Sequence, residues 1–176
     1  MRRSTITLVL AIAVIFLFQA VAPAGLHAQK HEKLYGLFQD VKGWKGDDPE
    51  GMAMDMPGMK MIQAIRTYSK GDKEVVAMII IGNAATTAPF MGQLGQSMNF
   101  ESDEAKVELK EMDGFTVYSI YDKEEHSGTV TVLLTKSEEE SSMFVITFED
   151  NNMETGLKLA KSFDWKEMKK KIEALD

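Results

Sequence analysis

Residues 51–61 read Gly51-Met-Ala-Met-Asp-Met-Pro-Gly-Met-Lys-Met61, and we expect the fold to be centred on this segment. The methionines recur two residues apart on both sides of Pro57-Gly58, and side chains two apart on an extended chain share one face. A Pro-Gly pair suits the central positions of a type II turn, so we expect the block to fold back on itself. The expected cross-strand partners are Met56 with Met59, Met54 with Met61, and Asp55 with Lys60.

A strand, a turn and a second strand follow this block. Residues 59–69 favour a strand, residues 70–73 are typical of a turn, and Glu74 to Ile81 form a nearly continuous apolar run. Such a run indicates a strand in the middle of a sheet, which requires a covering layer on each face. For one layer we expect a helix over Thr87–Met98, with Thr87 as its cap. Its apolar stripe is Phe90, Met91, Leu94 and Met98.

The second half of the chain has the pattern of an antiparallel meander. Two segments of alternating apolar residues flank Asp113-Gly114, a dipeptide that strongly favours a two-residue hairpin turn. Two more such segments follow, separated by charged loops. The predicted strands are residues 59–69, 74–81, 106–112, 115–122, 129–135 and 143–149.

Amphipathic segments at both ends of this pattern predict helices. Residues 30–39 have one apolar side, and residues 153–163 form the first of two C-terminal helical segments. Asp164 is typical of a new N-cap, because Glu167 three positions later can complete a capping box. The stripe of the last helix is Trp165, Met168, Ile172 and Leu175. We expect an α+β fold, an antiparallel sheet of about six strands with helices packed on it, in the order α-β-β-α-β-β-β-β-α.

The N-terminus has the features of a secretory signal peptide. Met1-Arg-Arg3 is basic, Ile6 to Phe18 is apolar, and small residues lead to Ala28. The alternative, an uncleaved membrane anchor, needs about 20 apolar residues, and this run is shorter. We therefore expect a signal peptide over residues 1–28 and one globular domain over residues 29–176, soluble in the periplasm or secreted, with no membrane span after cleavage.

Charge and cysteine content exclude several classes of function. The chain has 27 acidic and 20 basic residues, a formal net charge of −7. This acidic balance argues against nucleic acid and anionic lipid surfaces as partners. No cysteine is present, which excludes disulfides, thiolate metal sites, thiol catalysis and the acylated cysteine of a lipoprotein.

Two short motifs are similar to those of a known superfamily. Val41-Lys-Gly-Trp44 resembles the Pro-x-Gly-Trp signature of PsbP-like proteins, with Lys42 in place of proline, and Leu159-Ala-Lys-Ser-Phe163 resembles the end of their closing helix. The order of hairpin, helix, antiparallel strands and terminal helix is also similar. This resemblance implies an antiparallel sheet between helical layers, in an exported superfamily of mostly non-enzymatic binding and assembly factors.

The methionine block is the candidate ligand site of the sequence. Thioether sulfur is a soft ligand that favours Cu(I), and the folded-back block would place four such sulfurs on one patch. Methionine is also a common core filler, however, and a type II turn splays a two-residue hairpin. Three interpretations remain: a buried packing face, an adaptable surface for an apolar ligand or protein partner, and a copper site.

The sequence predicts an exported, non-catalytic binding or assembly module without a cofactor, whose partner is an envelope protein or an apolar ligand. Catalytic residues are not expected, because no Gly-x-Ser-x-Gly or His-Glu-x-x-His motif is present and His31 and His126 stand apart in the sequence. An enzyme would need a cleft that gathers His126 with carboxylates. The alternative function is periplasmic Cu(I) binding, with Met54, Met56, Met59 and Met61 as the metal ligands.

Overall fold

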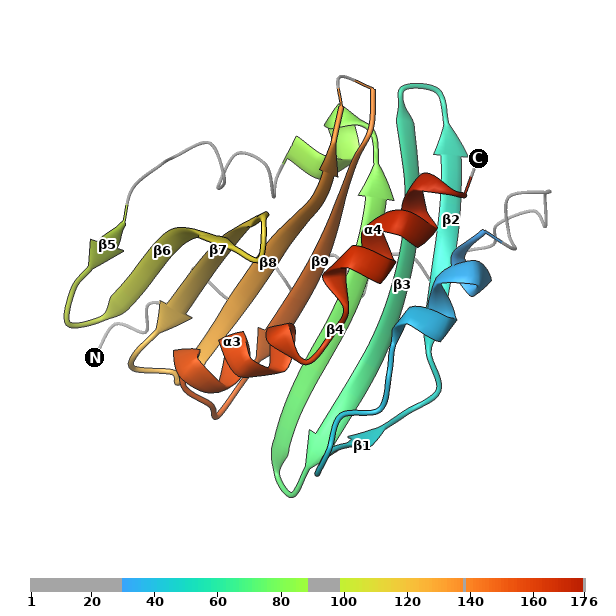
Figure 1. Ribbon diagram of the computed structural model, residues 1–176. Helices are drawn as coiled ribbons and strands as arrows, with labels where there is room; N and C mark the ends of the chain where they lie inside the picture. Colours follow the sequence, from blue (N-terminus) through green and yellow to red (C-terminus); the bar gives the residue numbers. More distant parts are fainter. Residues whose placement is uncertain (1–29, 89–98, 138, 176) are drawn as a thin grey trace.

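The computed structural model describes residues 30–88, 99–137 and 139–175. Its strands are β1 (Lys45–Gly46), β2 (Glu50–Met56), β3 (Met59–Lys70), β4 (Lys73–Gly82), β5 (Phe100–Glu101), β6 (Ala105–Met112), β7 (Phe115–Asp122), β8 (Ser127–Lys136) and β9 (Ser141–Phe148). Its helices are η1 (His31–Leu37), α3 (Met153–Lys161) and α4 (Trp165–Glu173). Within the described ranges, nine strands form one antiparallel sheet in the order β1-β3-β4-β9-β8-β7-β6-β5, and β2 pairs with β3 (Figure 1).

The α+β class and the antiparallel sheet are confirmed, whereas the predicted count of about six strands is wrong. The six predicted strands correspond to β3, β4 and β6 to β9. β1 and β5 have two residues each, which is too few to show an alternation of apolar and polar residues. β2 is the first half of the methionine block, whose exposed and half-buried side chains lack a core-strand pattern. The predicted element order is wrong for the same reason, since these three strands add to it.

β4 lies inside the sheet, as its continuous apolar run predicts. It pairs with β3 on one side and with β9 on the other. Alternate side chains of β4 enter two separate buried clusters, one on each face of the sheet. On the face that carries the helices they are Val75, Ala77, Ile79 and Ile81, and on the opposite face Met78 and Ile80. Burial on both faces stabilises the sheet centre by about 25 cal/mol per Å² of apolar surface.

β6 to β9 form the predicted meander, and β9 closes it against β4. Asp113 and Gly114 join β6 to β7 with φ angles of 54° and 86°. Positive φ at both central residues is the signature of a type I′ turn, whose twist matches that of the flanking strands. The Asp-Gly signal in the sequence therefore located this turn correctly.

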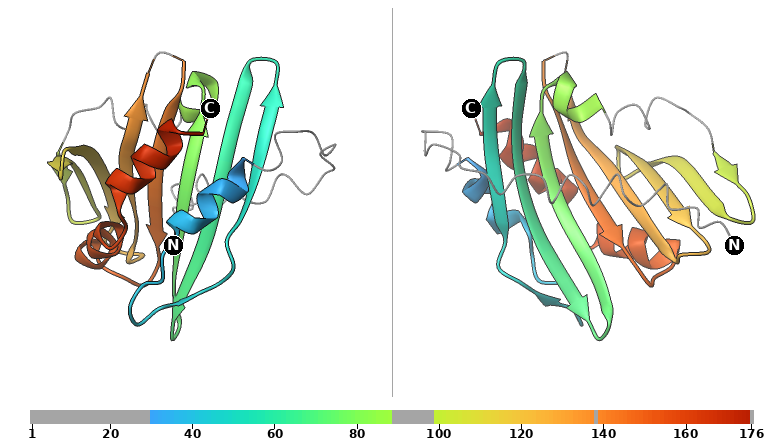
Figure 2. Two further views of the ribbon diagram at one scale, coloured as in Figure 1. Left: turned by 45° about the vertical axis from the view of Figure 1, so that its right-hand side comes forward. Right: turned by 180° about the vertical axis from the view of Figure 1, so that it is seen from behind.

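η1, α3 and α4 pack on one face of the sheet (Figures 1 and 2). The N-terminal segment is a 3₁₀ helix that buries Leu34, and Phe38 directly after it is also buried. Asn152 and Asp164 each accept a hydrogen bond from a backbone N–H in the first turn of α3 and α4, at 2.8 and 3.0 Å. The predicted cap at Asp164 is confirmed, as are Trp165, Met168 and Ile172 of the predicted stripe. Leu175, the fourth predicted member, lies beyond the end of α4 and is half-buried.

Residues 84–88 are helical and begin directly after Asn83. The expected cap at Thr87 is wrong, because Thr87 lies inside this segment, where its hydroxyl donates to the carbonyl oxygen of Asn83 at 3.0 Å. Most of the helix expected over Thr87–Met98, and the signal peptide expected over residues 1–28, lie outside the described residues. No helix in the described part of the chain is long and apolar enough to cross a membrane.

Candidate functional site: the methionine tip

The predicted methionine hairpin is present. β2 and β3 pair in the predicted register, with Met54 opposite Met61, Asp55 opposite Lys60, and Met56 opposite Met59. Gly58 has a φ of 79°, as expected for the residue after proline in a type II turn, and glycine adopts this conformation without steric cost. The register prediction is therefore confirmed residue by residue.

The four predicted site residues lie on one face of this hairpin, because cross-strand partners and residues two apart share a face. We call Met54, Met56, Met59 and Met61 the methionine tip. Met56 and Met59 are 45% and 37% exposed, whereas Met54 and Met61 are half-buried. Directly opposed side chains have Cβ atoms about 5 Å apart, and neighbours along a strand are about 7 Å apart. Flexible thioethers at these spacings can converge on one ligand.

A segment after β4 holds the end of the hairpin in place. The Asn83 side chain donates from Nδ2 to the carbonyl oxygen of Gly58 at 3.0 Å. The carbonyl oxygen of Lys60 accepts two hydrogen bonds, one from the Asn83 backbone N–H at 3.2 Å and one from the Thr86 hydroxyl at 2.9 Å. The backbone on both sides of Met59 is thus fixed. Sequence reasoning missed these contacts, since Asn83 and Thr86 show only the local pattern of a helix start.

Toward the sheet centre, the methionine tip continues into a buried apolar cluster. Gln63, which lies opposite Met52, donates from Nε2 to the sulfur of Met78 at 2.9 Å. The cluster consists of Met78, Ile80, Met143 and Val145, with Met61, Ile65 and Leu133 packed against it. The packing interpretation therefore fits the inner end of the methionine tip, and the surface interpretation fits its outer end.

His31 and His126 do not join the methionine tip. His31 lies on the helix-bearing face of β2, where a Cβ on Gly51 would stand 3.1 Å from its Cδ2 atom, and its Nδ1 is buried without a hydrogen-bond partner among the described residues. His126 precedes β8 at the opposite end of the sheet, with its Nδ1 3.1 Å from the hydroxyl of Tyr121. Any metal at the methionine tip would therefore be held by thioethers without these two imidazoles.

Two other features fit a binding function less well. In residues 30–88, 99–137 and 139–175, no group of three or more His, Asp or Glu side chains is arranged to hold a metal ion. An open pocket of about 180 Å³ lies between the β6–β7 turn and the α3–α4 junction, lined in part by Asp113, Lys161 and Trp165. Small-molecule sites usually occupy about 300–1,000 Å³, so this pocket is small for one.

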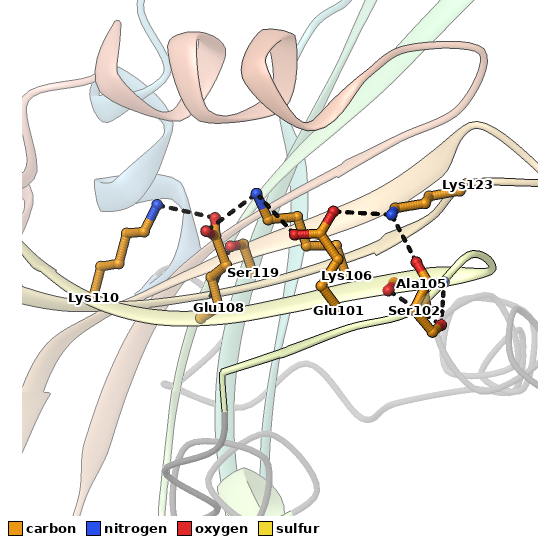
Figure 3. A network of polar contacts seen from close by, with 8 residues as sticks. All are labelled: Glu101, Ser102, Ala105, Lys106, Glu108, Lys110, Ser119 and Lys123. Atoms are coloured by element: carbon orange, nitrogen blue, oxygen red, sulfur yellow. Dashed lines mark hydrogen bonds and ion pairs between the residues drawn. The ribbon is translucent and has the colours of Figure 1, made fainter.

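A chain of ion pairs runs along the β5–β6 edge of the sheet (Figure 3). Lys106 lies 3.2 Å from Glu108 and 3.9 Å from Glu101, Lys110 lies 3.0 Å from Glu108, and Lys123 lies 2.9 Å from Glu101. Burial acts to raise the pKa of Glu108, but Lys110 and Lys106 outweigh it and hold that pKa below its ordinary value. A hydrogen bond from Lys123 likewise lowers the pKa of Glu101. Charges of both signs here are typical of a protected sheet edge.

No protein-family model, curated protein or solved structure matches the chain. The similarity of two short motifs to PsbP-like proteins stays a prediction. The proposals below therefore rest on the fold and on the methionine tip.

Proposed function

We propose that this chain is an exported, non-catalytic binding or assembly module and that the methionine tip is its binding surface. The signal-peptide pattern of residues 1–28 supports export to the periplasm or beyond. The scarcity of catalytic motifs in the sequence supports binding over catalysis. The partner that this surface fits is an envelope protein or an apolar ligand.

The observation that carries this proposal is the exposure of adjacent methionines on an edge hairpin. Met56 and Met59 are, with Phe100, the exposed large apolar side chains among the described residues. Single exposed apolar residues are ordinary, but these two are direct cross-strand partners and continue into half-buried Met54 and Met61. Methionine side chains are flexible and polarizable, so such a surface adapts to partners of different shape.

An introduced thiol tests this surface, because the chain has no cysteine of its own. Met56→Cys carrying a thiol-linked photo-crosslinker should form a discrete adduct with one envelope protein. Asp72→Cys is the matched control, since Asp72 is exposed in the β3–β4 turn at the far end of β3, the strand that pairs with β2. Equal adducts from both positions, or none from either, would contradict a protein-binding surface at the methionine tip.

Cu(I) binding is a second candidate function, and the register of the hairpin favours it. Met54, Met56, Met59 and Met61 offer four soft sulfur donors within reach of one point on a single face. Thioethers select Cu(I) over harder ions such as Mg²⁺ or Ca²⁺, which prefer oxygen. The hydrogen bonds from Asn83 and Thr86 hold the hairpin end through backbone oxygens, so these contacts occupy none of the four sulfurs.

A Cu(I) titration against a chromophoric chelator, without oxygen and under reducing conditions, tests this candidate. The test variant changes all four residues of the methionine tip to leucine, which keeps the apolar volume and removes the sulfur. The control changes Met112, Met143, Met153 and Met168 to leucine. One-to-one binding lost in the test variant and kept in the control supports a copper site. Equal affinity in all three folded proteins rules it out.

A further inference from the structure

The described methionines differ widely in exposure. Met56 and Met59 expose 45% and 37% of their surface at the end of the β2–β3 hairpin. The core methionines are almost fully buried: the exposed fraction is 0% for Met143, 1% for Met168, 7% for Met78 and 8% for Met153. An oxidant dissolved in water therefore meets Met56 and Met59 directly, whereas the core methionines require opening of the fold.

We propose that Met56 and Met59 form a sulfoxidation site, at which hydroperoxides oxidise the protein before they reach the core methionines. The sulfur lone pair of the thioether attacks one oxygen of the peroxide, the O–O bond breaks, and an S–O bond forms. With hydrogen peroxide, one oxygen atom passes to sulfur and water leaves with both hydrogens. Sulfur is oxidised by two electrons and the peroxide is reduced by two, so no further reactant is required. Sulfoxide reductases can reverse this modification.

The surroundings of the two residues allow this reaction without unfolding. The hairpin end is held by backbone carbonyls of Gly58 and Lys60, which bond to Asn83 and Thr86 and involve no sulfur. Met56 and Met59 are exposed, so water can hydrate an added oxygen without opening of the fold. Oxidation of Met143 would instead place a polar oxygen in a fully buried cluster, where an unpaired polar group is costly.

Sulfoxidation would change what the methionine tip can bind, a consequence that rests on the proposed function. A sulfoxide is polar and chiral, so oxidation of Met56 and Met59 converts two flexible apolar side chains into polar ones. An apolar partner would lose its contact surface. A Cu(I) ion would lose two of four soft sulfur donors, because the modified sulfur carries oxygen.

Limiting hydrogen peroxide followed by digestion and fragment mass spectrometry tests the proposal. Trypsin releases residues 46–60 as one peptide, in which fragment ions separate Met56 and Met59 from Met52 and Met54. We expect both exposed residues to react at least roughly a hundredfold faster than Met143 and Met168, whose reaction requires an opening that costs several kcal/mol. Comparable rates for Met143 or Met168 would overturn the proposal.

A variant and a silver ion separate this inference from the proposed function. Met56→Leu with Met59→Leu should remove the fast phase of peroxide consumption, and an unchanged fast phase would overturn the sulfoxidation site. Ag(I), a soft ion that mimics Cu(I) without redox cycling, should slow oxidation of Met56 and Met59 if the methionine tip binds soft metal. Fast oxidation that Ag(I) does not slow supports the sulfoxidation site while counting against the copper site.

Discussion

Tyr68 is a buried tyrosine whose ionisation is coupled to folding. Its side chain is 1% exposed, and its hydroxyl donates to the carbonyl oxygen of Gln39 at 2.8 Å. Burial raises the pKa of Tyr68 to about 12, although the Arg66 guanidinium, 5.1 Å from the ring centroid, acts to lower it. The folded chain therefore holds the hydroxyl proton more tightly than the unfolded chain, whose tyrosine pKa is about 10.

The stability of the protein should fall in alkaline solution because of this residue. A raised pKa contributes stability that is complete below about pH 10 and declines as the pH rises toward 12. Tyr68→Phe should lower the unfolding free energy by about 1 kcal/mol at neutral pH, through the lost hydrogen bond, and should flatten the alkaline decline. Urea unfolding from pH 7 to 11.5 measures both effects. An alkaline decline of equal slope in the two proteins would contradict this assignment.

Gly156 allows α3 to lie against Phe148. A Cβ atom at Gly156 would overlap the Phe148 ring, which is itself 2% exposed and stacked against Tyr121. Gly156→Ala should therefore destabilise the protein by about 1–3 kcal/mol from overpacking, reduced by up to about 1 kcal/mol of helix propensity. Gly36→Ala is the control, because no atom lies within 4 Å of its added methyl group. Equal unfolding midpoints for the two variants would disprove the close approach.

The pairs of the methionine tip could be predicted from the sequence because the alternation and the Pro-Gly turn are local signals. The partners of Asn83 and Thr86 could not, because they lie in the β2–β3 hairpin, which only the folded sheet brings near. The same holds for the Gln63–Met78 hydrogen bond. A single polar residue in an apolar strand indicates that some partner exists, but the sequence does not identify it.

At the scale of elements, the β2–β3 hairpin depends on the segment that follows β4. Thr86→Val keeps the shape of the side chain and removes its hydrogen bond to Lys60, and Asn83→Ala removes the bond to Gly58. We expect the double variant to raise amide hydrogen exchange across β2 by roughly thirtyfold, since each of the two lost bonds costs about 1 kcal/mol locally.

Thr86→Ser, which retains the hydroxyl, serves as the control for this prediction. Exchange in β7 and β8 should stay unchanged in every variant, because these strands lie across the sheet from the hairpin. Faster exchange throughout the sheet would indicate global destabilisation and contradict a local role for these contacts.

Which elements could be predicted depends on how local their signals are. The Asp164 cap and the Asp113-Gly114 turn involve residues three or fewer apart, and both are confirmed. β1 and β5 exist only because β3 and β6 offer them hydrogen-bonding edges, so no local pattern marks them. β2 was missed as a strand although its fold-back was predicted, because an edge strand buries little.

At the scale of the whole molecule, the ion pairs of the β5–β6 edge should keep the protein monomeric at that edge. Replacing Lys106, Glu108 and Lys110 together with threonine leaves a strand of high β propensity in which Glu111 is the single remaining charge. Such an edge is a template for pairing with other chains, so we expect self-association in light scattering. The control is Lys42→Thr, which lowers the net charge by one unit, as the triple variant does, but at a position away from that edge. Identical scattering from both variants would contradict edge protection.

The strand order of the sheet could not be predicted from the sequence. The hairpins β3–β4, β6–β7, β7–β8 and β8–β9 connect neighbours in the chain, and each has a turn signal. The β4–β9 pairing joins distant segments, and two apolar strands carry no local information about which distant partner each one selects. The α+β class followed from the pattern of elements, whereas the join between the two halves of the sheet did not.

The β4–β9 pairing determines how long β4 lacks one of its partner strands during synthesis. β9 fills the position between β4 and β8, with Val75 opposite Phe148 and Gly82 opposite Ser141. At about 5–20 residues per second, the roughly 60 to 70 residues between these partners take several seconds to appear. During that interval the most apolar strand of the molecule has one bare edge, so a holding factor that covers residues 75–81 would protect the nascent chain where it is most prone to aggregate.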